Sequence, residues 1–161
     1  MAKKGISVWD GSTTAAENAK RVLPRLAIGF FRTGRKLVDE NASYEELHAF
    51  RLEAKRFRYS LELFRPLYSQ GLERRLDSLR QVQQYLGEIN DCVTTRALLE
   101  AMAAGRSKAT AQMFAFLESE ATRIAADFRT FWKEKFDLPG QERQWAGYLR
   151  RFAGKASGRG E

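Results

Sequence analysis

The feature that most constrains the fold is the segment 47–68, which carries two stripes of residues side by side. In the first stripe, apolar residues recur at steps of three and four, the spacing that places side chains on one face of an α-helix. Such a face packs against other helices, so the segment predicts a core-facing helix. The stripe consists of Leu47, Phe50, Ala54, Phe57, Leu61, Phe64 and Tyr68.

The second stripe is basic and repeats the same steps one position further along the chain. Successive residues of an α-helix are turned by about 100°, so this stripe lies beside the apolar face. The only acid in the row is Glu62, which leaves most of the positive charge uncompensated. Cations at a regular spacing suit a polyanion whose own charges repeat. We call this row the basic ridge: His48, Arg51, Lys55, Arg58 and Arg65.

The overall composition agrees with a charged partner. The 161 residues are enough for one domain with a core, and their formal net charge is +8. A surplus of that size favours nucleic acid, an anionic membrane surface or polyphosphate. The alternative is a basic protein whose charge binds nothing specific, and the regular spacing of the cations argues against it.

Metal and hydrolase motifs are missing from the sequence. One cysteine, Cys92, and one histidine, His48, fall short of the four ligands of a zinc or iron–sulfur site. There is no glycine-rich phosphate loop. We therefore expect a non-catalytic protein with no metal and no cofactor. A lone thiol, no secretory signal and no apolar run of about 18 residues indicate the cytoplasm.

The N-terminal part predicts a flexible lead-in over 1–12 and then a helix. Thr13 or Thr14 is expected to cap this first helix. Pro24 either kinks the helix or marks its true first turn. A second basic row lies beside its apolar face: Arg21, Arg25, Arg32 and Arg35.

Local signals also predict where the next helices begin and end. Ser43, with Glu46 three residues later, is a capping box before the striped helix. The third helix is expected to end or bend at Gly87, and Asn90 or Asp91 to cap a fourth. Asp91 has a second interpretation, as an acid that orients a nearby arginine.

The C-terminal part predicts a long helix over about 107–136 and a short one over 142–152. We expect an all-α fold: one antiparallel helical bundle of about four to five helices over 13–152. A disordered basic tail is expected over 153–161.

Two residue types bear on the choice of ligand. His48 heads the ridge one turn before Arg51 and is expected to donate to a phosphate, weakly when neutral and more strongly when charged; the alternative is a structural histidine. Trp132, Trp145 and Tyr148 are less clearly core residues than the other aromatics. Exposed aromatics would stack on bases, which keeps single-stranded nucleic acid open as a ligand.

Two stretches of the chain resemble the motifs of one family. From His48 the sequence reads HAFRLEAKRFRYSLELF, with an arginine three residues after the histidine and a Lys-Arg-apolar-Arg-Tyr cluster at 55–59. The later stretch LGEINDC, at 86–92, has a Leu-Gly pair followed by an aspartate. Over about residues 14–136 the chain resembles the CHAD (conserved histidine α-helical domain) family.

The resemblance implies an all-helical, non-catalytic protein that binds inorganic polyphosphate, in some members on polyphosphate or polyester storage granules. The ligand residues that it implies here are His48, Arg51, Lys55, Arg56 and Arg58; Tyr59 matches the same pattern. The family usually has two similar bundles related by approximate twofold symmetry. This chain has one histidine motif and so resembles a half-domain, from which we expect a homodimer that polyphosphate strengthens.

The sequence thus predicts a polyphosphate-binding protein with a basic groove built from the first and second helices. The expected groove residues are His48, Arg51, Lys55, Arg56 and Arg58 with Arg21, Arg25, Arg32 and Arg35, and Arg80 from the third helix. The alternative is an RNA- or DNA-binding helical protein. A helical phosphohydrolase is a third hypothesis, and it requires grouped acids and a metal that the sequence does not show.

Overall fold

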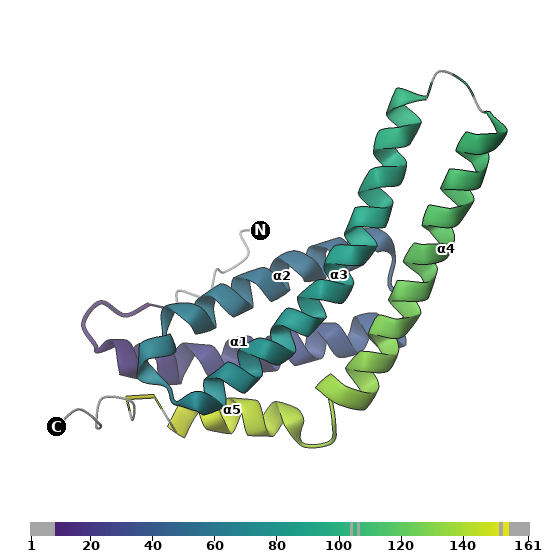
Figure 1. Cartoon of the computed structure of the whole chain (residues 1–161). Helices are drawn as coiled ribbons and strands as arrows, with labels where there is room; N and C mark the ends of the chain where they lie inside the picture. The colour runs from purple at the N-terminus through teal and green to yellow at the C-terminus, as the bar shows by residue number, and fades with distance from the viewer. Residues whose placement is uncertain (1–8, 104, 106, 152, 155–161) are drawn as a thin grey trace, which may run out of the picture.

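Five α-helices build the fold, as the computed structural model in Figure 1 shows. The structure describes residues 9–103, 105, 107–151 and 153–154, and no strand occurs among them. The predicted all-α bundle of about four to five helices is confirmed. The helices are α1 (Ala15–Asp39), α2 (Tyr44–Leu63), α3 (Gln70–Met102), α4 (Lys108–Phe131) and α5 (Gln141–Arg151).

Both predicted N-terminal caps are present. The hydroxyl of Thr14 accepts a hydrogen bond from the Glu17 N–H at 3.2 Å and so caps α1. At α2, the Ser43 hydroxyl accepts from the Glu46 N–H at 3.2 Å, and the Glu46 carboxylate accepts from the Ser43 N–H at 2.8 Å. This completes a capping box. Pro24 does not mark the first turn of α1, because it lies buried inside the helix.

The apolar stripe packs into the core as predicted. All seven of its residues are buried, although Phe64 and Tyr68 lie beyond the last residue of α2, around the short 3-10 helix η1 (Arg65–Leu67). Phe50 and Phe57 contact Phe30 of α1 with ring centroids 4.8 and 5.2 Å apart. The stripe therefore holds α2 against the inner face of α1.

The predicted break at Gly87 is wrong. Helix α3 is continuous from Gln70 to Met102, so Asp91 lies within the helix and caps nothing. A glycine inside a helix costs only about 1 kcal/mol relative to alanine. Burial of Leu86 and Ile89 on either side of Gly87 outweighs that cost.

The end of α4 continues into a π-helix, η2 (Trp132–Phe136), so the helical path ends near residue 136 as predicted. The Asp137 N–H donates to the Trp132 carbonyl at 2.7 Å and closes this wider turn. Trp132, Trp145 and Tyr148 are buried, contrary to expectation, because η2 and α5 fold back against the aromatic side chains of α1.

The described residues nearest to each end of the chain contact the bundle. Trp9 stacks on Phe64 at a centroid distance of 5.8 Å, and the Asp10 N–H donates to Asn18 at 2.8 Å, so residues 9–12 are not the flexible lead-in that was expected. Ala153 is buried at the other end. The rest of the predicted lead-in and tail, 1–8 and 155–161, lies outside the described residues.

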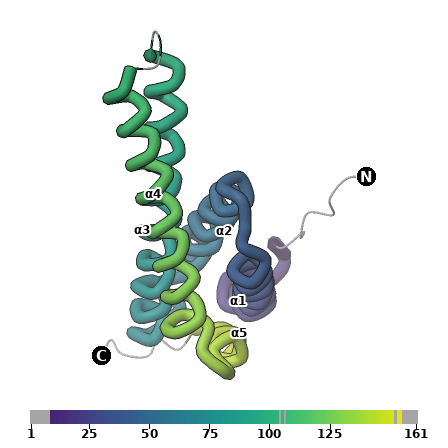
Figure 2. Tube along the Cα trace, turned by 90° about the vertical axis from the view of Figure 1, so that its right-hand side faces the viewer, coloured from purple at the N-terminus to yellow at the C-terminus, as the bar shows by residue number. Residues whose placement is uncertain are grey.

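The helices form a bundle with one long projection (Figures 1 and 2). Helix α2 lies between α1 and α3, and α5 lies beside α1. The C-terminal part of α3 and the N-terminal part of α4 extend beyond the other helices as an antiparallel hairpin. In the described part of the chain, no helix has the length and apolar character needed to cross a membrane.

Candidate functional site

The basic ridge follows the edge of α2 that lies beside α3. Near one end, His48 Nδ1 and Asn90 Oδ1 are 2.8 Å apart, and near the other end Glu62 lies 3.8 Å from Arg80. These two contacts join antiparallel helices. The ridge positions between His48 and Glu62 therefore lie along the junction of α2 with α3.

Arg51 and Lys55 occupy the middle of the ridge. Both are partly buried, and neither has an ion pair or hydrogen bond to a side chain in the described part of the protein. Removing a cation from water without an opposing charge costs free energy. An anion placed beside this pair would offset that cost, so these two side chains form the core of a candidate anion site.

Arg58 continues the row and keeps an unused donor. Its Nε is buried without a hydrogen-bond partner, since the nearest carboxylate oxygen, on Glu62, is 3.7 Å away. Glu62 is shared with Arg80, whose own side chain donates to Asp77 at 2.6 Å. One glutamate at these distances compensates the two arginines only in part.

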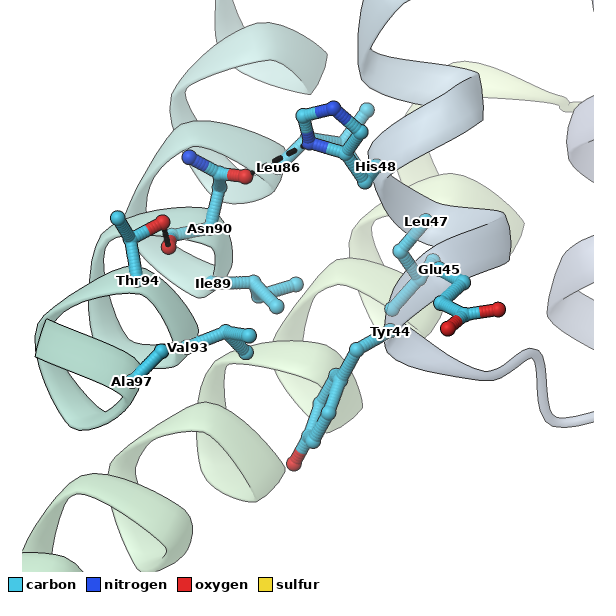
Figure 3. A pocket seen from close by; sticks show the side chains of 10 residues that line it. All are labelled: Tyr44, Glu45, Leu47, His48, Leu86, Ile89, Asn90, Val93, Thr94 and Ala97. Carbon is cyan, nitrogen blue, oxygen red and sulfur yellow. Dashed lines mark hydrogen bonds between the residues drawn. The ribbon is translucent and has the colours of Figure 1, made fainter. Parts of the chain in front are cut away.

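His48 is exposed at the head of the ridge, and one nitrogen of its ring forms a hydrogen bond with Asn90 (Figure 3). With the Asn90 oxygen accepting, the proton of the neutral imidazole is on Nδ1. Nε2 then carries a lone pair and cannot donate to a phosphate. In this tautomer the ring donates outward only when it is protonated, and the expected contact of His48 with a ligand stays a prediction.

A pocket of about 410 Å³ opens beside His48, where α2 and α3 diverge (Figure 3). Its walls are mostly hydrocarbon, from Leu47, Leu86, Ile89 and Val93, with Asn90 at the rim. An apolar surface does not solvate a phosphate. The pocket thus marks where the ridge ends and is not part of the candidate anion site.

Comparison with known proteins tests the resemblance seen in the sequence. The model of the CHAD domain family matches residues 3–100, which is more than half of the chain. The chain belongs to the CHAD family. The match covers α1, α2 and nearly all of α3 but ends before α4, whereas the resemblance was expected to reach about residue 136. No curated protein and no solved structure matches the chain.

Two arginines of this CHAD protein are paired with acids away from Arg51 and Lys55. They are Arg35, which was predicted to line the groove, and Arg65 of the basic ridge. Arg35 donates to Asp137 at 2.8 and 2.9 Å and to Glu142 at 3.1 Å, and these bonds raise its pKa. Arg65 lies beyond α2 and donates to both carboxylate oxygens of Glu73, which raises its pKa as well. Neither belongs to the unpaired part of the ridge.

The other arginines of α1 are not brought to the ridge. Arg35, in the same row, forms an ion pair with Glu142 of α5, and α1 lies on the far side of α2 from α3 (Figure 2). Arg21 donates to Asn18 at 2.9 Å, while Arg25 and Arg32 are exposed. The neighbour of the ridge is therefore α3, not α1 as predicted.

Arg56 lies on a different side of α2 from the ridge. Burial raises the pKa of Glu53, and a hydrogen bond from Thr33 of α1 and the charge of Arg56 act in the opposite direction. Glu53 thus connects α2 to α1, with Arg56 close by. Arg56 is separated from Arg51 and Lys55, although it lies in the same sequence motif.

The residues at 86–92 contribute one partner that the sequence did not reveal. Asn90 was expected only as a helix cap, yet it binds His48 from 42 positions away.

Asp91 is exposed, and none of its described contacts is with an arginine. Burial, followed by nearby acids, raises the pKa of Cys92, which disfavours a reactive thiolate.

Proposed function

We propose that this CHAD protein binds inorganic polyphosphate along the α2–α3 junction, without catalysing a reaction on it. The observation that carries the proposal is the partly buried, unpaired couple Arg51 and Lys55 between His48 and Arg58. The family match is compatible with this ligand.

The mechanism that we propose is electrostatic and depends on spacing. Neighbouring ridge cations lie about 5 Å apart along the helix axis at about 1.5 Å per residue. The guanidinium groups of Arg51 and Arg58 can each hold two phosphate oxygens, and Lys55 acts as a point charge. His48 adds a donor when protonated. Arg80 flanks this set, whereas Arg56, Arg21, Arg25 and Arg32 contribute only through the general positive field.

A second copy would add a second ridge. The two chains repel each other through their net charge of +8, and bound polyphosphate would relieve that repulsion. We therefore propose a homodimer that polyphosphate strengthens. A cytoplasmic location, with association to storage granules through the same polyanion, belongs to this proposal.

Nucleic acid is the second candidate ligand because of one aromatic residue. Tyr59 is 52% exposed, and its ring lies 5.0 Å from the Arg58 guanidinium. A base could stack on this tyrosine beside the cations. Polyphosphate remains preferred, since Trp132, Trp145 and Tyr148 are buried and cannot extend such a platform.

A competition experiment separates the two ligands. Labelled polyphosphate bound to the protein is displaced with unlabelled polyphosphate, single-stranded DNA or duplex DNA of matched total charge at fixed salt. We expect polyphosphate to compete at the lowest concentration. Stronger competition by single-stranded DNA, lost in Tyr59→Ala, would instead support the nucleic-acid function.

A further inference from the structure

The projecting hairpin has no core of its own. Burial of apolar side chains on α3 ends at Ile89, and on α4 it begins at Leu117. No residue between these two positions is buried in the part that the structure describes. This stretch nevertheless contains several large apolar side chains.

Several of these side chains are exposed on the two helices of the hairpin. Leu98 and Met102 of α3 are 58% and 73% exposed, and Met113 and Phe116 of α4 are 49% and 59% exposed. Leu99 and Met102 line the same hollow as Met113, so the two helices contribute to one continuous surface. We call these three residues, together with the exposed neighbours Leu98 and Phe116, the hairpin face: Leu98, Leu99, Met102, Met113 and Phe116.

The contacts that join the two helices at this distance from the bundle include one exposed ion pair. Arg96 forms an ion pair with Glu118, and its guanidinium lies 5.9 Å from the Phe114 ring. Exposed ion pairs contribute little to stability. Isolated helices of this length are marginal in water, and most helical stability comes from packing an apolar face. The hairpin face is therefore suited to be covered.

We propose that the hairpin face of one copy packs against the hairpin face of a second copy. Two antiparallel hairpins that meet through apolar faces make a four-helix bundle, and a twofold axis lets each copy supply the core that the other lacks. The local charge permits this contact. Residues 91–120 contain four acids and three bases, so they contribute −1 to a chain of +8. The cations that oppose association lie elsewhere.

This inference rests on the proposed function only for the expectation that two copies pair. The hairpin face itself is identified from the exposure of its side chains and from the lack of buried residues in the described chain between Ile89 and Leu117. The two can fail separately. Polyphosphate binding depends on Arg51 and Lys55 of α2, whereas pairing through the hairpin depends on residues of α3 and α4.

Sedimentation equilibrium of the full chain, from micromolar to submillimolar concentration, tests the surface. The variants are Met102→Glu and Phe116→Glu, and Leu63→Glu at the end of α2 is a matched control because Leu63 is 72% exposed. We expect the wild type and Leu63→Glu to dimerise alike. The two hairpin variants should raise the dimer Kd at least about 100-fold, since a twofold interface contains each substitution twice.

Hydrogen exchange on the wild type gives a readout that needs no variant. Amide protection over 95–116 should rise with protein concentration, while protection of α1 should not. A strictly monomeric wild type, or a dimer that both hairpin variants leave intact, would overturn the proposal. Polyphosphate titrations of the same variants reveal separately whether the ridge function holds.

Discussion

A single proton decides what His48 contributes to anion binding. In the tautomer whose Nδ1–H donates to the Asn90 oxygen, the neutral ring presents only a lone pair at Nε2. Protonation adds both a donor and a positive charge at the end of the ridge. At the scale of residues, the ridge therefore combines permanent cations with one that depends on pH.

We predict that polyphosphate binding is stronger at mildly acidic pH than at neutral pH, because a protonated His48 adds a donor and a charge. The gain should be about tenfold, the worth of one hydrogen bond to a charged group at about 1.5 kcal/mol. It is present at low pH and is lost as the pH rises and the ring becomes neutral. Binding titrations at mildly acidic and at neutral pH should show the gain in the wild type and not in His48→Gln. The same gain in both proteins would leave His48 a structural role.

Two glycines of α1 show how tightly this element packs. Gly34 is buried, and a methyl group there would overlap the indole ring of Trp132. Gly29 is exposed, with no atom within 4 Å of its Cβ position. The two glycines share a helix, so their alanine variants differ mainly in packing.

Gly34→Ala should lower the free energy of unfolding by about 1–3 kcal/mol through overpacking. Gly29→Ala should raise it by about 0.5–1 kcal/mol, because alanine loses less backbone entropy in a helix. Urea unfolding of both variants measures these changes. A neutral Gly34→Ala would mean that α1 and η2 pack less closely than described.

Helix α5 is tied to the region of η1 by a buried hydrogen bond. The Tyr68 hydroxyl donates to the Leu149 carbonyl at 2.7 Å. Burial, followed by the influence of Tyr148, raises the pKa of Tyr68. Because the pKa is raised on folding, the contribution of Tyr68 to stability is complete below the ordinary tyrosine pKa of about 10 and is lost at higher pH.

We predict that Tyr68→Phe lowers the free energy of unfolding by about 1–3 kcal/mol, since the Leu149 carbonyl loses its donor. The variant should also lose less stability than the wild type between neutral and strongly alkaline pH. Thermal unfolding across that range is the measurement, with the exposed Tyr59→Phe as control. Equal pH profiles for the wild type and Tyr68→Phe would contradict this role.

At the scale of the whole molecule, the salt dependence of binding reports how many ridges act together. Three contacts, from Arg51, Lys55 and Arg58, predict a log–log slope of about −2 at about −0.7 per contact. Two ridges of a dimer on one polyphosphate chain predict about −4. Titrations at several salt concentrations, below and above the dimer Kd, should show both slopes. A slope near zero would exclude an electrostatic mechanism.

Features set by local sequence could be predicted, and features set by distant contacts could not. The buried stripe of α2 and the Ser43 capping box depend on residues within a few turns, so their spacing was informative. The partners of Arg35 and His48 lie 102 and 42 positions away. No local pattern indicates such distances. For the same reason, the sequence placed the cations of α1 beside the ridge, whereas the fold places α3 there.

The central claim is that unpaired ridge cations bind polyphosphate, and one pair of double variants tests it most directly. Arg51→Ala/Lys55→Ala removes two charges from the ridge, and Arg143→Ala/Arg150→Ala removes two exposed charges from α5 that have no ion pair in the described chain. The measurement is the polyphosphate Kd of both variants at fixed salt. We predict at least a 100-fold loss for the ridge variant, from two charge-assisted contacts of about 1.5–3 kcal/mol each, and less than about threefold for the control. Equal losses in the two variants would contradict the account.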